Sequence, residues 1–136
     1  MEKELAQQVL GFAEQAVDKL QPETIILYGS YATKTFIRKV SDVDIIILSE
    51  RFAKKFLDRL ADLSSLVPPG SRIEALGYTP EEFHKMLLQA HPTAIDAVEF
   101  GIALYGEEPF RKYQNLLKEL YQKGLTRRKH TFTLPS

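Results

Sequence analysis

Two short stretches in the first half of the chain combine residue types that suit phosphate and metal chemistry. Gly29-Ser30 follows an apolar run at residues 24–28, and Asp42 and Asp44 open a second apolar run. A glycine at the end of a strand lets the backbone turn tightly. If Ser30 begins a helix, the N–H groups of its first turn and the serine hydroxyl can bind phosphate. The first stretch therefore predicts a site for the terminal phosphates of a nucleotide.

The acidic residues predict a cation beside these phosphates. Asp42 and Asp44 occupy alternate positions of a strand, so their carboxylates point to the same side and repel each other. Carboxylate oxygens of this kind suit Mg²⁺, which completes its shell with water and phosphate oxygens. Glu74 interrupts a mostly apolar strand at residues 72–78 and would join the pair if the two strands were neighbours. Three carboxylates at one rim are typical of two-metal phosphoryl transfer.

Each feature also has an explanation without function. Gly29-Ser30 is compatible with an ordinary turn between a strand and a helix, and the two aspartates with a solvated strand end. Glu74 is compatible with an edge strand that carries a charge against aggregation. Asp96 and Glu99 are alternative third acids if the Glu74 strand lies elsewhere.

Hydrophobic spacing predicts the elements that must position these residues. Apolar residues three and four apart predict helices, and apolar runs without that period predict buried strands. Thr79-Pro80-Glu81-Glu82 is a strong helix start, because it combines an N-cap, a proline at the first helical position and a glutamate that can reach back to the cap. The alternation predicts an α/β fold with one sheet of about four strands flanked by helices. Because the link between the first two strands is short, we expect a mixed rather than a fully parallel sheet. The expected strands are 24–28, 43–48, 72–78 and 100–106, and the expected helices are 1–20, a short one from Ser30, 50–63, one from Thr79 to before His91, 93–99 and 110–121.

Length and composition limit the classes of function. The chain has 136 residues, 18 Lys and Arg against 18 Asp and Glu, and no cysteine. We expect one domain at residues 1–124 and a flexible tail at 125–136. Disulfides, thiolate metal sites and a cysteine nucleophile are excluded. Balanced charge gives no strong nucleic-acid signal, and the absence of a long apolar run favours a soluble, cytoplasmic protein without membrane contact.

The combined motif resembles a known family. Gly29-Ser30, eleven intervening residues and then Asp42-Val43-Asp44 before an apolar strand resemble the hG[GS]…Dh[DE]h pattern of the DNA polymerase β-like nucleotidyltransferase superfamily. The nearest resemblance is to the minimal nucleotidyltransferases that accompany HEPN-domain partners in prokaryotic toxin–antitoxin modules. It extends over roughly residues 20–106 and includes the Glu74 strand with its following helix.

The resemblance implies roles for individual residues. Gly29 and Ser30 would bind the β- and γ-phosphates of a nucleoside triphosphate, and the catalytic acids Asp42, Asp44 and Glu74 would hold two Mg²⁺ ions. Glu74 would hold the ion that activates an acceptor hydroxyl, and it replaces the commoner aspartate. Lys34 would supply the positive charge of a missing loop arginine.

The implied activity is Mg²⁺-dependent transfer of a nucleoside monophosphate, AMP from ATP, with release of pyrophosphate. The resemblance implies an acceptor hydroxyl on a partner protein, such as a HEPN toxin that the chain neutralises as an antitoxin. The short chain also leads us to expect that the acceptor surface lies partly on a second protein. Two alternatives stay open: a non-catalytic nucleotide- or protein-binding module that masks its partner, and a homo-oligomer that acts on a small molecule.

Overall fold

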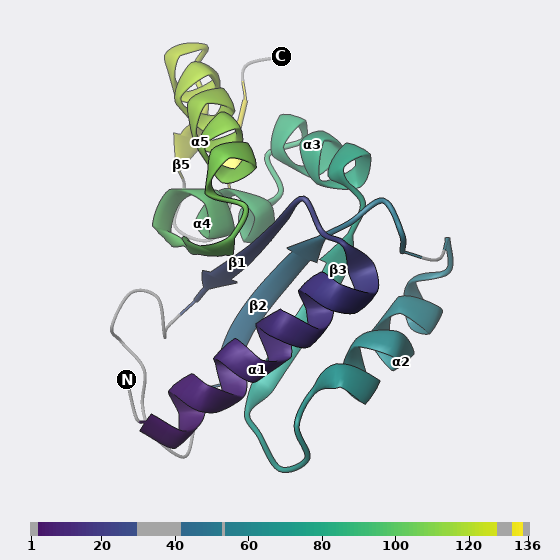
Figure 1. Cartoon of the computed structure of the whole chain (residues 1–136). Coiled ribbons are helices and arrows are strands. Elements are labelled where there is room, and N and C mark those ends of the chain that lie inside the picture. The colour runs from purple at the N-terminus through teal and green to yellow at the C-terminus, as the bar shows by residue number, and fades with distance from the viewer. Residues whose placement is uncertain (1–2, 30–41, 53, 128–131, 135–136) are drawn as a thin grey trace.

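The structure is a computed structural model that describes residues 3–29, 42–52, 54–127 and 132–134. In these ranges the chain forms five helices, a four-stranded sheet and a pair of two-residue strands (Figure 1). The elements are α1 (Lys3–Leu20), β1 (Thr24–Tyr28), β2 (Val43–Leu48), α2 (Phe56–Leu66), β3 (Ile73–Tyr78), α3 (Pro80–Leu88), α4 (Pro92–Phe100), β4 (Ile102–Tyr105), α5 (Glu107–Gln122), β5 (Thr126–Arg127) and β6 (Phe132–Thr133).

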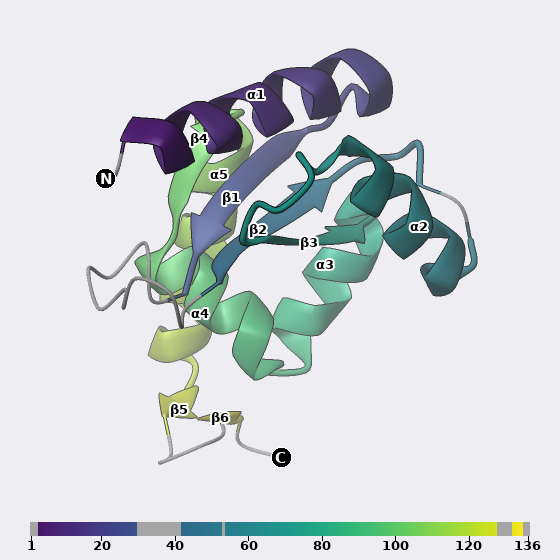
Figure 2. The same ribbon diagram turned by 90° about the horizontal axis from the view of Figure 1, so that it is seen from below.

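The sheet is mixed, as the sequence predicted. Its strand order is β3-β2-β1-β4, in which β1 is antiparallel to both β2 and β4, whereas β3 is parallel to β2. Helices α1 and α2 cover one face, and α3, α4 and α5 cover the other (Figures 1 and 2). Strands β1 and β2 are therefore enclosed on both faces, while β3 and β4 form the two edges of the sheet.

Alternation along β2 divides the core into two clusters. Ile45 and Ile47 pack with the apolar side of α1, whereas Ile46 and Leu48 pack with α3, α4 and α5. All four side chains are fully buried. Because each face of the strand meets helices, the strand reads in the sequence as a continuous apolar run.

The start of α3 has the geometry that its sequence predicted. The backbone N–H of Glu82 donates a hydrogen bond to Thr79 Oγ1 at 3.2 Å, and the N–H of Thr79 donates to Glu82 Oε1 at 2.7 Å. This reciprocal capping box satisfies two backbone donors that the first helical turn leaves without partners, and Pro80 occupies the first helical position.

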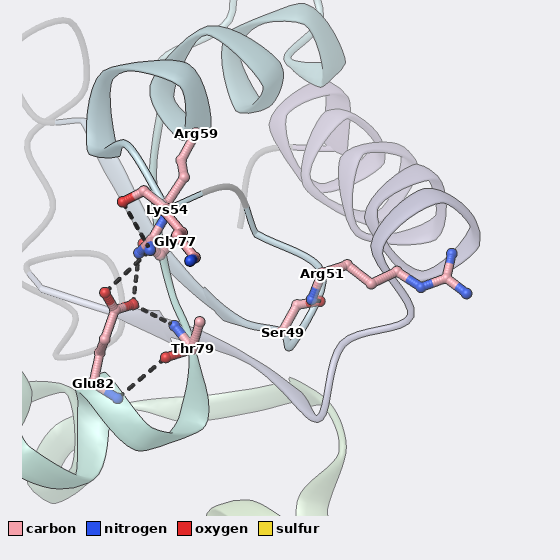
Figure 3. A network of polar contacts seen from close by, with 7 residues as sticks. All are labelled: Ser49, Arg51, Lys54, Arg59, Gly77, Thr79 and Glu82. Carbon is pink, nitrogen blue, oxygen red and sulfur yellow. Dashed lines mark hydrogen bonds and ion pairs between the residues drawn. The ribbon is translucent and has the colours of Figure 1, made fainter.

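A buried arginine joins α2 to α3 and to β3 (Figure 3). Arg59 is only 4% exposed, and its two terminal nitrogens donate to the Glu82 carboxylate at 2.6 and 3.1 Å. The guanidinium also reaches the carbonyl oxygens of Gly77 at 3.4 Å and Lys54 at 3.5 Å, and lies over the Phe52 ring. One side chain thus ties the C-terminal half of β3 to the two helices beside it.

We expect Arg59→Met to lower the free energy of unfolding by about 2–3 kcal/mol, because the buried fork of hydrogen bonds is lost while much of the packing remains. Urea unfolding of the wild type and of Arg59→Met and Arg59→Lys measures this. The lysine variant should recover only part of the loss, since a point charge cannot reproduce the bidentate contact. A loss below about 0.5 kcal/mol for Arg59→Met would contradict a structural role.

Two expectations concern segments that the structure describes only in part or leaves out. The short helix expected from Ser30 lies outside the described residues. Within the segment expected to be a tail, Leu125 is buried in the core, and Arg127 forms ion pairs with Asp96 at 3.2 Å and Glu99 at 2.7 Å. Among the helices of the described ranges, none combines the length and apolar character needed to cross a membrane.

Candidate active site

Polar side chains form a row across three strands at one end of the sheet. Asp44 pairs with Tyr28 of β1 on one side and with Glu74 of β3 on the other. Residues directly opposite each other on neighbouring strands point to the same face, so the three side chains lie on the face that carries α3, α4 and α5. Asp42 precedes Asp44 by two residues, and its side chain is exposed. The row marks the end of β1 and the beginnings of β2 and β3, which meet at one end of the sheet (Figure 2).

Gly29 brings the backbone directly against this row. Its φ angle is +76°, in the left-handed region that residues with a side chain rarely adopt. A Cβ atom at this position would overlap Oδ2 of Asp44 and would lie 3.2 Å from its Cγ atom. Only glycine therefore allows both the turn after β1 and the present position of the Asp44 carboxylate.

The electrostatics of the row favour a bound cation. Partial burial, followed by the negative charges of Glu74 and Asp42, raises the pKa of Asp44 to about 6. Burial, followed by the charge of Asp44, raises the pKa of Tyr28 above its ordinary range, so that its hydroxyl stays protonated. A cation at the row would relieve the repulsion between the acids and return Asp44 to its ionised form.

The donor chemistry fits Mg²⁺, although the protein does not present a complete cage. Among the residues that the structure describes, no group of three or more acidic or histidine side chains is placed closely enough to hold a metal by itself. Mg²⁺ does not require such a group, because one or two carboxylates and several water or phosphate oxygens satisfy its shell. Asp44 and Glu74 are adjacent in the register and can serve as those carboxylates.

The raised pKa of Asp44 predicts how the stability of the metal-free protein depends on pH. Its pKa is raised from 3.8 to about 6 in the folded state, so the folded protein retains a proton that the unfolded chain releases. The contribution of Asp44 to the free energy of unfolding is therefore complete below about pH 4 and is lost as the pH rises through about 6.

In EDTA at about pH 7.5, Asp44→Asn should therefore raise the melting temperature by roughly 2–5 °C, a modest figure because the carboxylate is partly solvated. The gain should shrink at about pH 5, where the wild-type carboxyl is mostly protonated. Differential scanning calorimetry of both proteins at the two pH values tests this. An equal gain at both values would show that the ionisation of Asp44 does not govern the effect.

The structure brings together four of the residues singled out in the sequence, and two others belong to α4 rather than to a strand beside Asp44. Gly29, Asp42, Asp44 and Glu74 lie at the same end of the sheet, whereas Asp96 and Glu99, the alternative third acids, contact Arg127 from α4. Ser30 and Lys34 lie outside the described residues.

Sequence reasoning missed two members of the site. Tyr28 is opposite Asp44, and Arg72 precedes Glu74 by two residues at the start of β3. Tyr28 directly precedes the predicted glycine turn, and Arg72 alternates with Glu74, so both signals were present. Only the strand pairing shows that these two residues lie beside the acids, and the sequence alone does not reveal this pairing.

The chain matches the family model described as "Nucleotidyltransferase domain" over residues 10–123. This range contains the whole row of acids and the glycine turn. The chain belongs to the nucleotidyltransferase domain family. Its enzyme class is accordingly that of the nucleotidyltransferases. No curated protein matches the sequence.

Solved structures share the nucleotidyltransferase fold at low sequence identity. A protein from Sulfolobus solfataricus named as a candidate nucleotidyltransferase superposes with a TM-score of 0.55 and 13% identity, covering 75% of this chain and 80% of its own. A toxin–antitoxin structure with AMP-PNP gives a TM-score of 0.53 at 20% identity and covers 85% of this chain and 86% of that one. A mutant of the toxin–antitoxin MntA–HpeT gives 0.51 at 16% identity, with 85% coverage of each chain.

Proposed function

We propose that this nucleotidyltransferase moves AMP from ATP to a hydroxyl group on a partner protein in a Mg²⁺-dependent reaction. The observation that carries the proposal is the adjacency of Asp44 and Glu74 on one face, with Gly29 packed against the Asp44 carboxylate. Two carboxylates beside a tight backbone turn support this proposal, because they would suit a metal-bound triphosphate.

The strand order suggests a role for each side of the site. Gly29 directly follows β1, and Ser30 and Lys34 after it in the sequence would bind the terminal phosphates. Asp44 on β2 and Asp42 just before it would face the α-phosphate, and Glu74, on the edge strand β3, would face the acceptor. Bound Mg²⁺ would neutralise the charge of the phosphates and of the departing pyrophosphate.

The proposed reaction balances without any further reactant. The acceptor hydroxyl oxygen forms a bond to the α-phosphorus, and the bond from that phosphorus to the oxygen bridging to the β-phosphate breaks. Pyrophosphate leaves with the electron pair of that bond. The hydroxyl proton would pass to a neighbouring carboxylate, for which we propose Glu74, and from there to water.

A toxin–antitoxin role is supported by the fold neighbours. Two of the similar structures are toxin–antitoxin complexes, one of them with an ATP analogue. We propose that the partner is a HEPN-type toxin and that modification of its hydroxyl neutralises it in the cytoplasm.

The test is a transfer assay with α-labelled ATP, Mg²⁺ and the co-expressed partner or host lysate. We expect label on a protein acceptor, which EDTA should abolish. A γ-labelled control should give no labelled protein, because the γ-phosphate leaves with pyrophosphate. If the wild type labels no protein while still neutralising its partner, the chain acts by masking and the proposal is wrong.

A further inference from the structure

The outer edge of β3 is closed in one half and open in the other. Val43 N–H donates to the Arg72 carbonyl, and Ser49 N–H donates to the Tyr78 carbonyl, so the even-numbered residues of this segment face β2. In a parallel ladder the intervening residues then direct their N–H and C=O groups away from the sheet. These are Ile73, Ala75 and Gly77.

Arg59 and its surroundings close the C-terminal half of this edge. The outward carbonyl of Gly77 accepts a hydrogen bond from Arg59, whose other nitrogen reaches the carbonyl of Lys54, just before α2 (Figure 3). The Phe52 ring packs so closely on Gly77 that a Cβ atom there would overlap it. This half of the strand cannot accept another chain.

The N-terminal half of the edge has no such cover. In the described part of the chain, no hydrogen bond occupies the outward backbone groups of Ile73 and Ala75. Proteins ordinarily protect exposed strand edges, because these edges pair readily with other chains. Here the covered part of the edge stops at Gly77, and the uncovered part includes the residues on both sides of Glu74. Glu74 is the acid that we propose to face the acceptor.

A groove follows the open half and ends at the catalytic acids. Its volume is about 670 Å³, and residues 71–76 line it together with Leu60 of α2, the turn at residues 67–70 and the two acids Asp42 and Glu74. Among the described residues that line it, there is one cation, Arg72, against two anions. This charge disfavours a nucleic acid, which needs a basic surface for its phosphates.

Arg72 gives the groove a polar anchor. Its Nη1 atom and the Oγ atom of the preceding Ser71 are buried, and neither has a hydrogen-bond partner within the described part of the chain. Arg72 is opposite Asp42 by extension of the β2–β3 register and shares a face with Glu74. Because the Arg72 side chain lines the groove, its positive charge would attract a carboxylate on the ligand.

We propose that the open edge of β3 binds the acceptor as an extended polypeptide segment. The segment would pair with the backbone of Ile73 and Ala75, as an added strand does in other peptide-binding proteins. Its hydroxyl residue would face Glu74, and an acidic residue would face Arg72. Because Glu74 and Arg72 are two residues apart on one face, the acid and the hydroxyl should be two residues apart in the acceptor. This inference rests on the proposed protein acceptor and specifies how that acceptor is bound.

Synthetic decapeptides test the spacing. Each peptide carries a central Tyr, Ser or Thr among β-branched residues, with Glu or Lys two residues before or after the residue that bears the hydroxyl. A single-stranded oligonucleotide with a free 3′-hydroxyl serves as the competing class of acceptor. We expect kcat/KM for AMP transfer to be at least about tenfold higher with Glu than with Lys, one hydrogen-bonded charge pair being worth about that factor. Arg72→Glu should reverse the preference. Equal transfer to both peptides, or transfer only to the oligonucleotide, would overturn the inference.

A pair of variants tests the strand addition itself. Ala75→Pro removes the outward N–H and leaves the ladder to β2 intact, whereas Ala75→Val keeps the N–H at a similar side-chain volume. We expect KM for the acceptor to be at least about tenfold higher in the proline variant than in the valine variant. The thermal shift of each variant with Mg²⁺ and ATP reports whether the fold and the nucleotide site are intact.

The outcomes separate this inference from the proposed function. If the wild type labels no protein at all, the proposed function fails. If it labels a protein but no peptide, or if Ala75→Pro and Ala75→Val transfer equally, the acceptor binds elsewhere and only the strand addition is wrong.

Discussion

Asp44→Asn is expected to lower the rate of AMP transfer by about a hundredfold to a thousandfold, as removal of one central electrostatic group from an active site usually does. Asparagine keeps the shape of the side chain but removes the charge that balances the cation. The pairing of Asp44 with both Tyr28 and Glu74 places it at the centre of the row, so no neighbouring strand position can replace it.

The transfer assay should be combined with a measurement of folding. Because Asp44→Asn is expected to stabilise the metal-free protein at neutral pH, loss of activity in this variant cannot be attributed to unfolding. Glu74→Asp is the matched variant for the acceptor side: it should retain more activity than Glu74→Gln, since it keeps the charge and shortens the side chain by one methylene. An Asp44→Asn protein with transfer within about threefold of the wild type would show that this carboxylate is not part of the catalytic site.

Gly29→Ala is expected to lower the transfer rate by about ten- to a hundredfold, because a displacement of about 1 Å in a catalytic group has effects of this size. The added methyl group would overlap the Asp44 carboxylate and would force either the turn or the acid to move. The left-handed backbone should cost a further 1–2 kcal/mol of stability, roughly the penalty of that conformation for a residue with a side chain.

Gly70→Ala is the matched control for this variant. Gly70 has nearly the same φ angle, +77°, but a Cβ atom there meets nothing within 4 Å. Its loss of stability in urea unfolding therefore measures the backbone strain alone, and the excess loss in Gly29→Ala measures the overlap with Asp44. If the two variants were equally stable and Gly29→Ala bound Mg²⁺ and ATP as the wild type does, the close contact would have no functional role.

Arg59 covers one half of the β3 edge and leaves the other half, beside the candidate site, uncovered. Arg59 stabilises the fold through Glu82 and also occupies the Gly77 carbonyl, so that pairing with another chain is blocked there. The neighbouring segment with Ile73 and Ala75 is left open where it approaches the acids. Arg59→Met should therefore lower the free energy of unfolding and leave the affinity for Mg²⁺ nearly unchanged.

Local sequence determined most of the elements of this protein, although the helix expected at residues 50–63 begins only at Phe56. The helix that begins at Thr79 and the buried strand from Val43 depend on capping and on hydrophobic period, which act between residues close in the chain. The motif of Gly29, Asp42 and Asp44 was equally visible, because the aspartates alternate on one strand and the resemblance to nucleotidyltransferases rests on their spacing. The alternation of helices and strands predicted the α/β class, and the short link between the first two strands predicted that the sheet is mixed.

Only the tertiary structure decided which distant residues share the site. The parallel pairing of β2 with β3 made Glu74, rather than Asp96 or Glu99, the neighbour of Asp44, and it brought Tyr28 into the row from the other side. Strand order and register depend on how helices pack on both faces of the sheet, and the spacing of residues along one strand carries no information about its neighbours. For the same physical reason, the open edge beside Glu74 became visible only once β3 was known to lie at the border of the sheet.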